Sequence, residues 1–126
     1  MNDAVKGRSL YVYNKTRDTF VATHATVRTG ILGRLLGVCG KTKRWAQLGN
    51  GMCIVAARFA HTIGVTFPVD LVFLNQEDRV VYAEAHVRPF RIVKMSQAAK
   101  VLELPPHTIY RSGTMVGDSF EMTKTW

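Results

Sequence analysis

Two neighbouring runs in the middle of this sequence restrict its fold more than any other feature. VDLVFL at residues 69–74 and RVVYAEAHV at residues 79–87 are rich in β-branched, aliphatic and aromatic residues, and the polar stretch NQED separates them. Runs of this length and composition, bounded by turn-forming residues, are typical of β-strands. We therefore expect a β-hairpin over residues 69–87. The core residues expected in it are Leu71, Phe73, Val80 and Tyr82.

Similar short segments occur along the whole chain. Residues 9–14 and 20–27 predict a first hairpin, and further strands are expected at residues 52–55, 61–67, 90–95, 100–104 and 118–123. Short helices are expected at residues 31–36, after the N-cap Thr29, and at residues 107–112, before Gly113. The chain is therefore predicted to form one α+β domain over residues 1–126. It is mainly β, with an antiparallel, partly barrel-like sheet and one or two short helices.

The composition supports a packed core. The 126 residues are enough for one domain, and 47% of them are hydrophobic, so a core can form without metals or disulfides. No stretch reaches the roughly 18 apolar residues of a membrane span, and the first residues lack the apolar run of a signal peptide. We therefore expect a cytoplasmic protein as the sequence is written. Export would require that a leader had been removed.

Metal and cofactor chemistry is not predicted. Cys39 and Cys53 do not form a CxxC pair and the four histidines are scattered, whereas zinc sites use closely spaced ligands. We expect no metal, no cofactor and two free thiols. A disulfide between Cys39 and Cys53 would be expected only in an exported protein.

The positive charge is concentrated in one part of the chain. Residues 6–44 contain nine bases and one acid, so they carry the whole net charge of +8, while the remaining eight bases and eight acids cancel. This asymmetry indicates an acidic partner, which could be nucleic acid, anionic lipid or an acidic protein, and the alternative is a solvated surface without a partner. The residues expected to form the basic face are Lys15, Arg17, Lys41, Lys43 and Arg44.

Several polar residues lie in or beside apolar strands and suggest a second kind of site. Asp70 and Glu84 stand in the two strands of the expected central hairpin, which would bring them close together. Asp70 is expected to be buried, ionised and held by an arginine or by backbone N–H groups. One hypothesis is a small cleft for an anionic ligand, and the alternative is a structural ion-pair network. The candidate residues are Arg28, His61, Thr62, Asp70, Glu84 and Arg88.

From Gly30 onward the chain resembles the family called domain of unknown function 192. The matching segments are GILGRLLGV, GMCIV, HTIGVTFPVDLVFLNQEDRVV, VLELPPHT and GDSFEM, and the resemblance covers roughly residues 20–122. The chain departs from the family pattern at Gly64 and at Pro106-His107. The resemblance implies a compact, mostly β domain without an established reaction or cofactor. Some similar sequences look like accessory proteins of secretion or pilus systems.

Recognisable catalytic and nucleotide-binding motifs are missing from the sequence. It contains no Ser/His/Asp elbow, P-loop, GxGxxG or HExxH, so enzymatic activity stays uncertain and a role without catalysis is favoured. The first hypothesis is a binding or accessory module that meets an acidic partner with its basic face. The second is an enzyme or binding site for a small anionic ligand, near His61, Asp70, Glu84 and Arg88. The third is nonspecific nucleic-acid binding. The sequence leaves the oligomeric state open.

Overall fold

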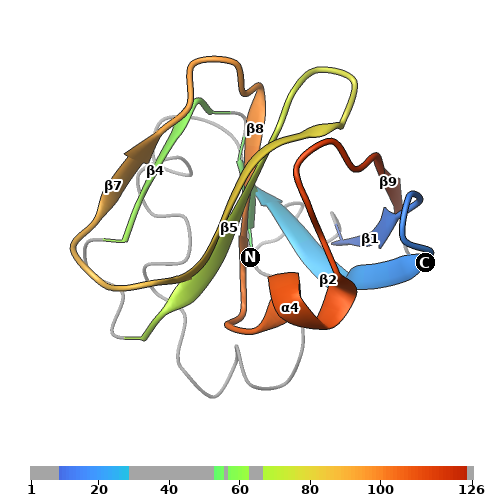
Figure 1. Cartoon of the computed structure of the whole chain (residues 1–126), viewed down its shortest axis with the longest axis horizontal. Coiled ribbons are helices and arrows are strands. Elements are labelled where there is room, and N and C mark those ends of the chain that lie inside the picture. Colours follow the sequence, from blue (N-terminus) through green and yellow to red (C-terminus); the bar gives the residue numbers. More distant parts are fainter. Residues whose placement is uncertain (1–8, 29–52, 56, 63–66, 125–126) are drawn as a thin grey trace, which may run out of the picture.

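The computed structural model describes residues 9–28, 53–55, 57–62 and 67–124 (Figure 1). These residues form short β-strands and one five-residue helix. The strands are β1 (Ser9–Asn14), β2 (Thr19–Arg28), β3 (Cys53–Val55), β4 (Phe59–His61), β5 (Val69–Leu74), β6 (Val80–Val87), β7 (Ile92–Lys94), β8 (Lys100–Leu104) and β9 (Phe120–Lys124). The helix is α4 (Thr108–Ser112). The predicted mainly β fold with a short helix is confirmed.

Seven of these strands form one strongly curved sheet in the order β6-β5-β8-β3-β2-β1-β9. Neighbouring strands run antiparallel, except that β2 and β3 run parallel. The sheet is not closed into a barrel. Its two edge strands approach each other at one end, where Arg79 and Ser119 form an isolated antiparallel bridge. The partly barrel-like prediction therefore corresponds to a curled sheet whose edges nearly meet.

The remaining two strands, β4 and β7, pair with each other as a separate antiparallel ribbon. We call β4 and β7 the ribbon. Figure 1 shows the ribbon at one side of the molecule, and β1 and β9 at the opposite side. Ala60 and Val93 face each other in the ribbon and are both buried. The ribbon therefore covers one face of the sheet with a small apolar surface.

Because side chains alternate along β5, this central strand supplies two cores. Leu71 and Phe73 belong to the ribbon core, which lies on the side of the ribbon, whereas Val72 and Leu74 belong to the sheet core on the other face. The ribbon core also contains Ala57, Ala60, Phe67, Val69, Val87, Val93, Ala98 and Val101. The sheet core also contains Val12, Val21, Ala22, Ala25, Val80, Leu102, Leu104 and Phe120. All six residues of β5 are buried, which agrees with its largely apolar sequence, in which Asp70 is the one polar residue.

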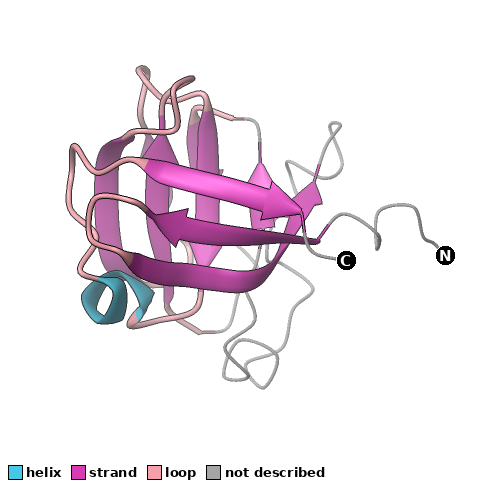
Figure 2. Cartoon of the chain, turned by 90° about the vertical axis from the view of Figure 1, so that its right-hand side faces the viewer, coloured by secondary structure: helices cyan, strands magenta, loops and turns pink. Residues whose placement is uncertain are grey.

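The helix α4 lies against one end of the strands (Figure 2). Thr108 donates its hydroxyl hydrogen bond to the carbonyl of Pro105 at 2.7 Å, which ties the start of the helix to the preceding Pro-Pro turn. Gly113 ends the helix at φ 70°, a left-handed conformation that glycine adopts without steric cost. The predicted helical turn and its glycine stop are both confirmed.

Most of the predicted strands coincide with observed ones. The central hairpin is confirmed, with Leu71, Phe73 and Val80 buried and Tyr82 half-buried. The strand expected at residues 61–67 is shifted, because β4 comprises Phe59–His61. The helix expected at residues 31–36 lies outside the described residues, as does Cys39. Within the described part of the chain, no helix has the length and hydropathy that a bilayer crossing requires.

Candidate functional site

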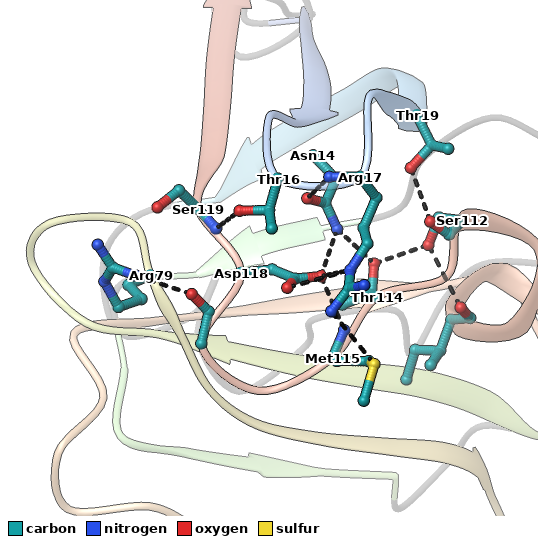
Figure 3. Close-up of polar contacts among 12 residues, drawn as sticks. Asn14, Thr16, Arg17, Thr19, Arg79, Ser112, Thr114, Met115, Asp118 and Ser119 are labelled. Atoms are coloured by element: carbon teal, nitrogen blue, oxygen red, sulfur yellow. Dashed lines mark hydrogen bonds and ion pairs between the residues drawn. The ribbon is translucent and has the colours of Figure 1, made fainter.

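A network of polar side chains joins the β1–β2 turn to the loop before β9 (Figure 3). Asp118 lies at its centre and is only 2% exposed. Its carboxylate accepts hydrogen bonds from Arg17 Nε at 3.0 Å, Asn14 Nδ2 at 2.9 Å and the backbone N–H of Met115 at 2.9 Å. Asn14 Nδ2 also donates to Thr114 Oγ1 at 3.3 Å. Because every contact of Asp118 is directed at another part of the chain, we interpret this network as structural.

The electrostatics of Asp118 agree with this role. Burial alone would raise the pKa of its carboxyl, but the hydrogen bonds from Arg17, Asn14 and Met115, with the charge of Arg17, outweigh burial and lower the pKa below the ordinary 3.8. The hydrogen bond to Asp118 and the charge of Asp118 raise the pKa of the Arg17 guanidinium, so both groups are charged at neutral pH. The Arg17 guanidinium is thus already engaged, although this residue was predicted to belong to a free basic face.

Replacing Asp118 with asparagine should lower the free energy of unfolding by about 1–2 kcal/mol at pH 7, because the ion pair with Arg17 becomes a hydrogen bond to a neutral amide. A carboxyl whose pKa is lower in the folded state stabilises the fold above its unfolded pKa, and this stabilisation is lost as the pH falls below about 4. The difference between wild type and Asp118→Asn should therefore shrink from pH 5 to pH 2. Urea unfolding across that range measures it. A difference that stays constant with pH would contradict the assignment.

Asp70 is completely buried in β5 and is held by backbone groups. Its Oδ1 accepts from the N–H of His86 at 2.9 Å, and its Oδ2 accepts from the N–H of Ile109 at 2.8 Å. The first bond secures an irregularity in β6 where the register with β5 shifts and His86 adopts φ 57°. The second supplies an acceptor to an N–H at the start of α4. Of the two predicted kinds of partner, the structure shows backbone N–H groups.

Glu84 belongs to a different cluster, on the ribbon side of the sheet. It lies opposite Leu71 in the register of β5 and β6, so it shares the face of Leu71 while Asp70 points to the other face. Glu84 Oε2 lies 3.2 Å from Arg91 Nη1, and Glu84 Oε1 accepts from Tyr82 Oη at 2.9 Å. That hydrogen bond, assisted by partial burial, raises the pKa of Tyr82 above the ordinary 10.0. Asp70 and Glu84 therefore do not converge on one cleft.

Thr62 organises the loop that enters the ribbon. It is 1% exposed, and its hydroxyl donates to the carbonyl of Arg88 at 2.7 Å and accepts from the N–H of Arg91 at 2.8 Å. Its backbone N–H donates to the carbonyl of Arg91 at 2.9 Å, and its carbonyl accepts from the N–H of Phe90 at 3.2 Å. We call residues 88–91 the tip loop. Four hydrogen bonds to one buried residue fix the backbone of the tip loop.

Phe90 is the most unusual residue of the tip loop. Its φ is 65°, and its side chain is 78% exposed. A left-handed backbone costs a bulky L-residue on the order of 1 kcal/mol, and an exposed phenyl ring gains little from burial. Such an outlier persists only when the surrounding structure imposes it, and it points to a functional constraint. The bonds of Thr62 supply this constraint here.

The outer face of the ribbon continues the character of the tip loop. Because Ala60 and Val93 point into the core, their strand neighbours Phe59 and Ile92 point outward, and they are 41% and 58% exposed. Four cations that lie close to these apolar residues in the sequence are exposed to solvent. They are Arg58, Arg88, Arg91 and Lys94. Since Glu84 is the partner of Arg91, three of these four cations, Arg58, Arg88 and Lys94, form no ion pair with another residue that the structure describes.

A wide polar cleft of about 690 Å³ opens beside the ribbon. Its lining includes Arg58, Asn75, Gln76, Glu77, Ser96 and Gln97. None of the six residues predicted for an anionic-ligand site lines it. In addition, the side-chain oxygen of Asn75 already accepts from the N–H groups of Glu77 and Arg79, both at 3.0 Å.

The other predicted residues that the structure describes belong to different elements. Arg28 ends β2, where it pairs with Val55 of β3. His61 ends β4 and is half-buried, and its Nδ1 atom has no hydrogen-bond partner among the described residues. Arg88 is exposed in the tip loop, and Lys15 is exposed in the β1–β2 turn. Lys41, Lys43 and Arg44 lie outside the described residues. The ligand-binding role of Arg28, His61 and Arg88 stays a prediction, as does the basic-face role of Lys15, Lys41, Lys43 and Arg44.

The geometry defines a small, mainly β domain with a curled sheet, a covering ribbon and an exposed, basic tip loop. Residues 16–122 match the DUF192 family of proteins described as "Uncharacterized ACR", and the chain belongs to this family. No curated protein matches the sequence.

Two solved structures share the fold. One is described as a "putative transcription regulator" from Sinorhizobium meliloti 1021, with a TM-score of 0.76, 15% identity, and coverage of 96% of this chain and 98% of that chain. The other is a protein of unknown function from Novosphingobium aromaticivorans DSM 12444, with a TM-score of 0.74, 17% identity, and coverage of 96% and 91%. At these identities the likeness concerns the fold alone.

Proposed function

We propose that this domain is a binding module whose ribbon and tip loop meet an anionic partner. The observation that carries the proposal is the conformation of the tip loop, which holds a 78% exposed phenylalanine at φ 65° between two arginines. An anchor that is fixed before binding loses less conformational entropy on association, so the strained backbone of Phe90 would favour binding. Exposed aromatic and arginine side chains are also the residue types that contribute most to binding energy at interfaces.

Charge supports an anionic partner. Arg58, Arg88 and Lys94 are exposed, and so are the apolar residues Phe59, Phe90 and Ile92. Glu84 is bonded to Arg91. The chain as a whole carries a net charge of +8, which attracts a polyanion toward it at long range. The ribbon then adds the short-range contacts that a uniform positive field lacks.

The alternative of a small-ligand enzyme has less support. Its acid candidates, Asp70 and Glu84, lie on opposite faces of the sheet, and the carboxylate of Asp70 is fully occupied by two backbone N–H groups. A general acid or base must reach the proton that it transfers, and Asp70 is 0% exposed. The geometry therefore favours a binding role over catalysis near these residues.

Single-stranded nucleic acid on the opposite side of the molecule is a second candidate, because aromatic side chains are exposed there. Tyr11 and Phe20 are 40% and 51% exposed on β1 and β2, and Phe20 contacts Tyr13 with ring centroids 5.1 Å apart. Arg111 donates to the carbonyls of Phe20 and Val21, both at 3.0 Å, which puts a guanidinium beside this aromatic face. Aromatic rings beside cations are typical of surfaces that bind single strands.

One binding experiment distinguishes these surfaces. The full chain is titrated with fluorescent heparin and with a labelled 20-nucleotide oligo-dT, from low to physiological salt. We expect the double reversal Arg88→Glu/Lys94→Glu to weaken heparin binding by about tenfold or more. Lys15→Glu should weaken heparin binding by less than about threefold. Both variants lose positive charge, but only the double reversal alters the ribbon and tip loop.

The outcome for Phe20→Ala identifies the second candidate. If that variant loses oligo-dT binding while the ribbon reversal keeps it, the β1–β2 face is the nucleic-acid surface and the ribbon is not. If the wild-type chain binds neither probe at low salt, the proposal of an anionic partner is wrong.

A further inference from the structure

We infer that the partner of the ribbon is the surface of an anionic lipid bilayer, with Phe90 inserted among the lipids. This inference rests on the proposed function and specifies its partner. It follows from three properties of the ribbon and tip loop, namely the exposure of their outer apolar side chains, the cations beside them and the rigidity of the tip.

The outer apolar side chains of the ribbon and tip loop are exposed, and of these only Phe59 also borders the polar cleft beside the ribbon. Phe90 is 78% exposed, Ile92 is 58% exposed and Phe59 is 41% exposed. Ile92 and Phe59 stand on the outer face of a two-stranded ribbon, and Phe90 precedes it by two positions. An exposed apolar tip gains free energy when it enters a soft apolar phase, which needs no matching pocket.

The cations lie next to the apolar residues along the chain or across the ribbon, which suits an interface with anionic headgroups. Arg58 precedes Phe59, Arg88 and Arg91 flank Pro89-Phe90, and Lys94 pairs with Phe59 across the ribbon. Guanidinium and ammonium groups at the level of phosphates can bind them while the neighbouring apolar groups go deeper. A bilayer offers anionic groups across a whole plane, so Arg58, Arg88 and Lys94 can all find partners at once. An acidic protein surface would have to match their positions individually.

The rigidity of the tip completes the argument. The hydrogen bonds between Thr62 and residues 88, 90 and 91 hold the backbone in the conformation that exposes the phenyl ring. A flexible loop could turn its phenylalanine back onto the ribbon core, which would bury the ring and remove the left-handed strain. A ring that is already held in the solvent can enter a bilayer without reorganisation of the loop, so the fixed conformation favours insertion.

The test is co-sedimentation of the full chain with large vesicles of phosphatidylcholine alone or with about 30% phosphatidylserine. We expect binding to the anionic vesicles to be on the order of 100-fold stronger, since each of three free surface cations contributes roughly a factor of five. Phe90→Ala should weaken binding to the anionic vesicles by about tenfold or more, because it removes the inserted ring. The matched control is Tyr110→Ala, which removes an 89% exposed aromatic ring from α4 and should leave vesicle binding unchanged.

Folding and function are separated by a second variant. Phe90→Gly relieves the positive φ, so the protein should melt at the wild-type temperature or slightly above it while vesicle binding is lost. If Phe90→Ala and Phe90→Gly bind anionic vesicles as the wild type does, the insertion is wrong. If the wild type binds heparin but not the anionic vesicles, the lipid partner is wrong and the proposed function survives. If it binds neither, both fall together.

Discussion

Replacing Phe73 with alanine will lower the free energy of unfolding by about 3–5 kcal/mol. Phe73 is fully buried in the ribbon core, and its ring packs against Tyr82 with centroids 6.0 Å apart. It stands on the central strand β5, which pairs with both β6 and β8. The remaining cavity cannot close easily, because hydrogen bonds fix the backbone on both sides of it. Since domains of this size are stable by about 5–15 kcal/mol, this one change removes a large share.

The measurement is urea denaturation followed by circular dichroism, with Phe90→Ala as the matched control. Both variants lose a phenyl ring, but Phe90 is 78% exposed, so its loss should change the free energy of unfolding by no more than about 0.5 kcal/mol. Equal effects of the two changes would mean that Phe73 is not packed in the ribbon core.

The second large effect is expected at Asp70. Asp70→Asn should cost about 2–4 kcal/mol, because the asparagine amide offers one acceptor oxygen where the carboxylate offers two, and its NH₂ group would face a backbone N–H. The N–H of either His86 or Ile109 then lacks an acceptor. Since the bond to Ile109 lies at the start of α4, the helix should loosen first. Hydrogen exchange at residues 109–113 would report this directly.

Asp18 provides the control for that experiment. It is an exposed aspartate in the β1–β2 turn with φ 59°, a conformation that asparagine also tolerates well. Asp18→Asn should therefore leave the free energy of unfolding within about 0.5 kcal/mol of wild type. An Asp70→Asn protein as stable as Asp18→Asn would show that the carboxylate is dispensable to the fold, and would revive a functional role for it.

The local architecture was largely predictable from the sequence. Strands with an alternating or largely apolar pattern, such as residues 9–14, 69–74 and 100–104, were predicted with the bounds that the structure gives. The reason is that β-branched and apolar residues bounded by turn formers leave few other local conformations. Gly113 was likewise identifiable as a helix stop, because its left-handed φ suits glycine.

The pairing of distant segments was not predictable in this way. The parallel contact of β2 with β3 and the pairing of β4 with β7 depend on the whole chain and leave no local signal. The tip loop illustrates the same limit at the candidate site. Pro89 marks a turn in the sequence, but the positive φ of Phe90 is imposed by Thr62, which lies 28 positions earlier in the chain.

The buried acids show why a polar constellation is hard to place from sequence. The hairpin over residues 69–87 correctly brought the strands of Asp70 and Glu84 together, but a register shift in β6 decides which face each side chain takes. Asp118, which the structure places in a buried network, was predicted only as part of a strand. Its contacts with Asn14 and Arg17 span more than 100 positions of sequence, so no spacing rule could have found them.

The pairing of β1 with β9 has a consequence for how this domain is made on the ribosome. β1 occupies residues 9–14 and its neighbour β9 occupies residues 120–124, so the first strand to be synthesised waits for the last one before its second edge is paired. The bond between Asn14 and Asp118, 104 positions apart, forms equally late. A nascent chain would thus expose an unpaired strand edge during most of its synthesis, when chaperones that shield such edges matter most. Completion of the sheet should be slow and should coincide with emergence of residue 124 from the exit tunnel, because contacts this far apart carry a high entropic cost of loop closure.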